Sequence, residues 1–179
     1  MASGRVTRDE VVAFYDGTGT DHAGRRIETI WAFDDRQLEA VHDYVQWLFP
    51  LPEASRFNPF APVLTPETAA AFRTRPDFRG RVLRSLDRML SFYGFVRDGS
   101  VIHGGPMPGD PSPHWLSAGN HNHLRLSRIV RFLHHAGLSP EARSLRDRLV
   151  ALAAERPGRV TADTRRHWQA LPPACDQIG

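Results

Sequence analysis

Apolar residues recur at three- and four-residue steps along most of the chain, which is the spacing of amphipathic helices. The longest such runs lie at residues 34–49, 65–75, 78–93, 120–136 and 139–156, and shorter ones lie at 9–15, 27–31 and 161–171. No run alternates strictly between apolar and polar residues, as a half-buried strand would. The pattern therefore predicts an all-α fold: a compact single-domain bundle of six to eight helices over residues 1–179.

The most apolar of these runs ends in the sequence Tyr-Val-Gln-Trp-Leu-Phe at residues 44–49. A segment this rich in aromatic residues has no face suited to water, so we expect a buried helix from Asp34 to about Phe49. Pro50 then ends it, because proline disfavours helical backbone in the residue before it. Gly94 and Gly137 follow two other periodic runs and are expected to end those helices in the left-handed conformation.

Two segments lack helical periodicity. Residues 98–119 are rich in glycine and proline and are predicted to form a long mobile loop, while residues 172–179 form a polar tail. No stretch reaches the ~18 apolar residues that a membrane-spanning helix requires, so no membrane insertion is expected. The N-terminus has no apolar signal segment, and the predicted location is cytoplasmic.

The amino-acid composition excludes only a few kinds of functional site. The 23 basic residues are all arginine, against 20 acidic residues, which gives a formal net charge of +3. Arginine without lysine, together with many alanines, glycines and prolines, predicts a GC-rich, bacterial source. Cys175 is the only cysteine, which excludes a disulfide framework and a thiolate metal site. Nothing in the sequence identifies a cofactor.

Several motifs occur together in an order that resembles the conserved domain of the opioid growth factor receptor family. They are Phe14-Tyr15, the run 44–51 (YVQWLFPL), Leu64-Thr65 with Phe72, the run 84–95 (RSLDRMLSFYGF), the run 120–129 (NHNHLRLSRI) and Gly137-Leu138. The resemblance covers residues 14–168. It implies an all-α domain and, for the family's named members, recognition of a small opioid peptide. We therefore expect a non-catalytic binding domain, and we expect the fold to carry over better than the named activity.

The run 120–129 supplies the preferred ligand site. It begins a helix whose free backbone amides favour an anion. We expect Arg125 and Arg128 to hold an anionic or peptide-like group, His121 and Asn122 to add hydrogen bonds, and Trp115 to cover an apolar part. The alternative interpretation is a solvated basic face on which Asn and His side chains cap the helix.

Histidines in the same region raise a second hypothesis, a metal-assisted enzyme using residues 114–123. The candidate ligands are His114, His121 and His123, with His103 earlier in the loop. On a helix the side chains of residues 121 and 123 diverge by about 200°, so the pair needs an extended backbone. We assign no metal site and no catalytic residue.

The expected partner is a small anionic ligand, a peptide or a protein, and a homodimer is left open. A nucleic-acid-associated regulatory protein is a further alternative. It is not favoured, because acidic residues are interleaved among the arginines after residue 140 and no stacking aromatic accompanies them.

Overall fold

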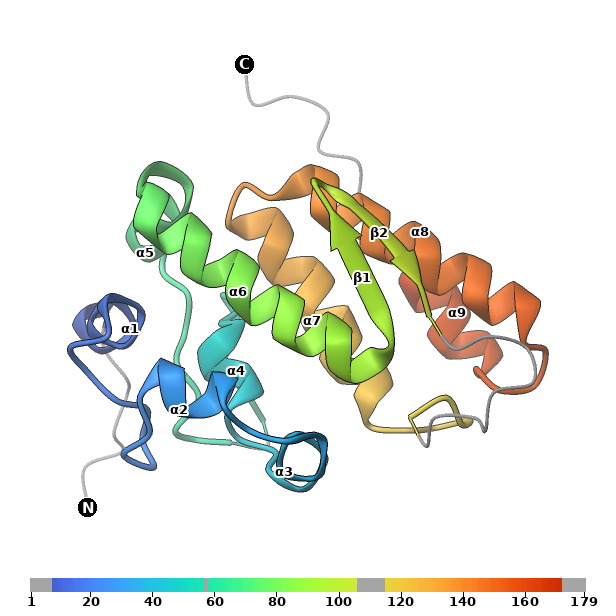
Figure 1. Cartoon of the computed structure of the whole chain (residues 1–179), viewed down its shortest axis with the longest axis horizontal. Helices are drawn as coiled ribbons and strands as arrows, with labels where there is room; N and C mark the ends of the chain where they lie inside the picture. The colour runs from blue at the N-terminus through green and yellow to red at the C-terminus, as the bar shows by residue number, and fades with distance from the viewer. Residues whose placement is uncertain (1–7, 57, 106–114, 172–179) are drawn as a thin grey trace. The chain divides into compact units, whose positions relative to one another are not determined.

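A computed structural model describes residues 8–56, 58–105 and 115–171 of the chain. The predictions for His114, for residues 106–114 of the loop at 98–119 and for the tail at 172–179 with Cys175 lie outside these residues. The chain divides into two compact units, residues 1–88 and 89–179, and Figure 1 shows the helices and strands of each.

The described residues are mostly helical, as predicted, but they also contain a two-stranded sheet. The first unit contains α1 (Arg8–Asp16), α2 (Ile27–Trp31), α3 (Asp35–Ala40), α4 (Val45–Leu48), α5 (Pro66–Thr74) and most of α6 (Pro76–Tyr93). The second unit contains β1 (Phe95–Asp98), β2 (Val101–Gly104), α7 (Asn122–His135), α8 (Ser139–Glu155) and α9 (Ala162–Gln169). The strictly all-α prediction is therefore wrong in one element.

Aromatic side chains form the core of the first unit. The Tyr15 ring meets the Phe72 ring edge-on at 4.6 Å between centroids, and Phe14 meets Trp47 in the same way at 5.3 Å. The Tyr15 hydroxyl donates to the backbone carbonyl of Leu48, so its polar end is also satisfied. These contacts explain why the run at 44–49 had no polar face.

The helix predicted at 34–49 is broken into α3 and α4, which corrects that prediction. Asp34 caps α3 as expected, but the backbone becomes extended at Val41, with φ −89° and ψ 129°. Beyond this break, Asp43 accepts a hydrogen bond from Arg25 Nη2 at 2.7 Å and lies 3.1 Å from His22 Nε2. These contacts come from a distant loop, so the local periodicity at 34–49 could not reveal them.

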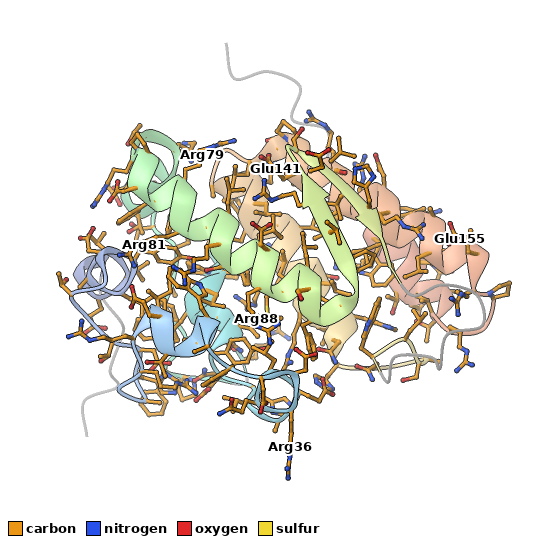
Figure 2. All side chains as sticks on the ribbon, viewed as in Figure 1. Arg36, Arg79, Arg81, Arg88, Glu141 and Glu155 are labelled. Atoms are coloured by element: carbon orange, nitrogen blue, oxygen red, sulfur yellow. The ribbon has the colours of Figure 1, made fainter. Side chains whose placement is uncertain are left out.

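Helix α6 confirms the helix predicted at 78–93 and its end, because Gly94 adopts a φ of 83° directly after it. Within the first unit, Arg88 of α6 donates to the carbonyl of Phe33 at 2.7 Å and to Asp35 at 2.8 Å. Arg36 of α3, by contrast, extends away from its helix into solvent (Figure 2).

The sheet is an antiparallel hairpin in which β1 pairs with β2, from Phe95 opposite Gly104 to Asp98 opposite Val101. Its two-residue turn begins at Gly99, whose φ of 57° suits such a loop. Phe95 and Ile102 point inward and are buried. The hairpin was missed because each strand has four residues, too few to show an alternating pattern, and because β2 lies in the glycine-rich stretch predicted to be a loop.

Helices α7, α8 and α9 confirm the three predicted helices of the C-terminal half. Gly137 follows α7 with a φ of 78°, and the Thr161 hydroxyl caps α9 by accepting from the backbone of Thr164. Helix α8 also supports the hairpin, since Ser144 Oγ accepts from the backbone N–H of Ile102 at 2.8 Å. Over the described ranges, no helix combines the length and apolar character needed to cross a bilayer.

Candidate functional site

The start of α7 forms a buried hydrogen-bonded network in the second unit. The Asn122 side chain is inaccessible to solvent, and its Oδ1 accepts from the Tyr93 hydroxyl at 3.1 Å and from Arg125 Nη1 at 3.3 Å. Its backbone and side-chain N–H groups both donate to Asn120 Oδ1. Arg125 is only 7 % exposed. Asn122 and Arg125 thus bond to each other inside the unit, and their contacts hold the helix start in place.

Trp115, predicted to cover an apolar part of a ligand, is a core residue. Its side chain is inaccessible to solvent and meets the rings of Tyr93 at 5.3 Å and Phe95 at 6.0 Å between centroids. Of the five predicted ligand residues, the structure therefore buries three. His121 is exposed and Arg128 is half-buried, so these two can reach a partner without rearrangement of the core.

His123 lies directly behind this surface, between two tryptophans. It is 3 % exposed, and its ring meets Trp168 at 5.3 Å and Trp115 at 6.5 Å in edge-on contacts. Within the described residues, neither ring nitrogen makes a hydrogen bond of normal geometry. Burial lowers the pKa of His123 below its usual value, the Trp115 backbone opposes this shift, and His121 adds to it. A buried imidazole without a well-formed hydrogen bond is unusual among core groups.

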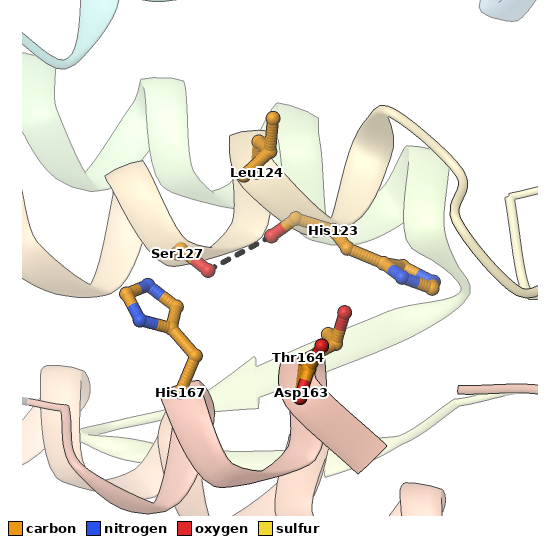
Figure 3. Close-up of a pocket in the computed structure, with 6 residues that line it drawn as sticks. All are labelled: His123, Leu124, Ser127, Asp163, Thr164 and His167. Atoms are coloured by element: carbon orange, nitrogen blue, oxygen red, sulfur yellow. Dashed lines mark hydrogen bonds between the residues drawn. The ribbon is translucent and has the colours of Figure 1, made fainter. Parts of the chain in front are cut away.

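A small pocket opens between α7 and α9 beside this histidine (Figure 3). It has a volume of about 240 Å³ and is lined by His123, Leu124, Ser127, Asp163, Thr164 and His167. Hydrogen bonds tie its two walls together. Trp168 Nε1 of α9 donates to Ser127 Oγ of α7 at 3.1 Å, and that hydroxyl donates to the His123 carbonyl at 2.9 Å. These hydrogen bonds fix α9 against α7, so the pocket is already formed before any partner binds.

Leu124 gives the pocket its apolar rim. It is 70 % exposed, although its neighbours His123 and Arg125 are both buried. A single exposed leucine is common on protein surfaces, but one that also forms the wall of a preformed pocket is typical of a contact site. We take this pocket and the α7 start as the candidate functional site.

The sequence predicted one wall of this site and missed the other. Leu124 and Ser127 lie inside the predicted segment but were not singled out, while Asp163, Thr164 and His167 come from α9. One signal was available: Leu124 lies 200° from Leu126 around the helix, outside the apolar stripe. No local pattern could have indicated that α9 faces it.

The histidines of the metal hypothesis are not gathered by the described part of the chain. His121 is exposed, His123 is buried between tryptophans, and His103 lies on the exposed face of β2. Across residues 8–56, 58–105 and 115–171, no group of three or more potential ligand side chains is close enough to hold a metal ion. The metal-assisted alternative stays a prediction, since His114 lies outside these residues.

Comparison with known proteins gives the family. The model of the opioid growth factor receptor (OGFr) conserved region matches residues 14–154, which is most of the chain. The chain belongs to this family. The matched range of this OGFr-family chain includes all of α7 and ends before α9.

Curated relatives agree with this assignment. The opioid growth factor receptor of Rattus norvegicus is 37 % identical over 122 residues, which covers 64 % of this chain and 20 % of the relative. The opioid growth factor receptor-like protein 1 of Mus musculus is 34 % identical over 110 residues, covering 60 % of this chain and 23 % of the relative. The matched part thus spans about a fifth of these relatives. No solved structure matches the chain.

Proposed function

We propose that this OGFr-family chain is a non-catalytic binding domain for a peptide or protein partner, and that it recognises the partner through the start of α7 and the facing side of α9. The observation that carries the proposal is the exposed Leu124 at the rim of a preformed pocket, on the segment predicted to bind. Family membership supports a receptor-like role.

The predicted residues fall into two groups: those at the surface would contact the partner, and the buried ones would hold the site in shape. His121 and Arg128 lie at the surface and are the residues that would contact an anionic or peptide-like group. Asn122 and Arg125 would act indirectly, because their hydrogen bond fixes the first turn of α7. Trp115 would also fix that turn, because its ring packs against His123.

The names of the relatives fit a peptide ligand, because they are called receptors of an opioid growth factor. The matched region is a small part of each relative, so the name does not tell which part of them binds. Our proposal for this chain is therefore a peptide- or protein-binding site, with the opioid growth factor as one ligand to be tried.

The proposal can be tested with short peptides selected from a displayed random library against the full 179-residue chain. We expect saturable binding that weakens about tenfold when His121→Ala and Arg128→Ala are combined, since each removes a polar contact. Arg36→Ala is the matched control, because Arg36 is an exposed arginine of the first unit. Peptides that bind the double variant and the wild type equally well would contradict this placement of the site.

A further inference from the structure

The pocket between α7 and α9 is small enough to limit what it can hold. Pockets for cofactors and drug-sized ligands run from about 300 to 1,000 Å³. At about 240 Å³, this one lies below that range and has room for one large side chain. Its size therefore favours a partner that inserts a single anchor residue.

The lining selects the character of that anchor. Leu124 presents apolar surface that is 70 % exposed in the unoccupied chain, and covering it removes that surface from water. The opposite wall adds Thr164 and His167 from α9, whose start is held by the Thr161 cap. An apolar side chain such as leucine, methionine or phenylalanine fits against such walls.

The charges of the two helices that form the pocket favour one type of flanking residue. Helix α7 contains three arginines and no acidic residue. Helix α9 contains two arginines and one aspartate, Asp163, which lines the pocket and pairs with Arg166. Among the described residues, no arginine lines the pocket itself, but the two helices together carry an excess of positive charge, so acidic residues beside the anchor are attracted and basic residues are repelled.

A second copy of this chain fits the pocket poorly. Its described exposed large apolar side chains, apart from Leu124 itself, are Phe60, Val96 and Val101. Phe60 and Val101 have no acidic residue within two positions, and between Val96 and Asp98 lies an arginine. None of the three combines an apolar side chain with acidic flanks.

We propose that the pocket between α7 and α9 binds one large apolar side chain of a partner protein segment whose neighbouring residues are acidic. This inference rests on the proposed binding function and specifies its partner. Because α9 lies beyond the matched family range, one wall of the pocket belongs to a part of the chain that the family model does not describe.

The test uses the selected peptides and the full chain. We expect them to share one leucine, isoleucine, methionine or phenylalanine with acidic residues within about two positions of it. Replacing that residue by alanine, or changing Leu124→Gln in the protein, should weaken binding about tenfold, because both remove the apolar contact. Lysine in place of the acidic residues should weaken it further.

The control is Val96→Thr, which makes an exposed apolar residue of the hairpin polar and should leave the affinity unchanged. Circular dichroism and thermal unfolding would be measured for each variant to check that the variant is folded. A Leu124→Gln variant that is folded and binds the peptides normally would overturn the proposal.

The remaining outcomes separate this proposal from the broader one. If peptides bind saturably but lack the apolar and acidic pattern, the anchor proposal is wrong and the binding function stands. If no peptide binds up to about 1 mM, both are contradicted. A dimer in sedimentation analysis that Leu124→Gln dissociates would assign the pocket to a second copy and would also overturn the proposal.

Discussion

His22 in the first unit and His123 in the second both lie against a tryptophan, yet their polar surroundings are opposite. Trp47 Nε1 donates to His22 Nδ1 at 3.0 Å, and His22 Nε2 lies 3.1 Å from Asp43 Oδ2. The proton of His22 therefore sits on Nε2, facing Asp43. His123 has two tryptophans as neighbours, and no hydrogen bond of normal geometry reaches either of its nitrogens from the described residues.

The contrast suggests different roles for the two regions. The His22 region joins a loop to the segment between α3 and α4, and both nitrogens of the imidazole have a polar partner, as a structural junction requires. The His123 region leaves polar atoms unengaged directly behind a pocket and an exposed leucine. Groups kept at such a cost are more often associated with function than with stability. Substitutions in each region and a pH titration test whether the two regions differ in this way.

The largest effect on stability is expected at Asp21, a buried acidic residue next to His22. Its carboxylate accepts from the backbone of Ala23 and from the backbone and Nε of Arg25, all at 2.9 Å or less. Asp21→Ala leaves these donors unsatisfied and should lower the free energy of unfolding by about 3 kcal/mol in urea titrations. Asp35→Ala removes an exposed ion pair with Arg88 and should cost less than about 1 kcal/mol. If both variants lost the same free energy of unfolding, Asp21 would not be part of a structural junction.

The next effect comes from making the same substitution at both histidines. His22→Phe removes the acceptor of the buried Trp47 N–H and should cost about 2 kcal/mol. His123→Phe removes no well-formed hydrogen bond, so its stability should lie within about 1 kcal/mol of the wild type. Chemical unfolding followed by tryptophan fluorescence measures both. A larger loss at His123 than at His22 would reverse the comparison.

The smallest effect is a dependence of stability on pH. Burial lowers the pKa of His123 in the folded state, so below the unfolded value of about 6.5 the unfolded chain binds a proton that the folded chain does not. Stability should therefore fall as the pH drops from about 6.5 towards the folded pKa, by no more than about 1.4 kcal/mol per pH unit. The wild type should show a steeper loss over this interval than His123→Phe. Parallel curves for the two proteins would show that His123 is not the cause.

The sequence was sufficient where structure depends on local periodicity. The apolar steps from Leu126 to Leu133, with Gly137 after them, predicted α7 to within two residues at its start and one at its end. Helices α8 and α9 followed from the same reasoning. The family resemblance carried by residues 44–51 and 120–129 was confirmed by the family match.

The sequence could not predict features that depend on contacts between residues far apart in the chain. The break between α3 and α4 depends on Asp43 meeting Arg25, and the pocket depends on α9 meeting a helix about 40 residues earlier in the chain. The predicted ligand residues were chosen by chemical type, and burial then placed Asn122, Arg125 and Trp115 inside the unit. Periodicity indicates the two faces of a helix but not which polar residues a neighbouring helix will cover.

The most direct test of binding at the second unit is to map a selected peptide onto the chain by NMR, using the isotope-labelled protein at neutral pH. We expect the largest amide shift changes at residues 121–128 of the α7 segment and 163–167 of α9. We expect little change around His22, Asp43 and Trp47, whose polar groups are already engaged. Changes concentrated at those three residues, with none at Leu124 or His167, would contradict the assignment of binding to the second unit.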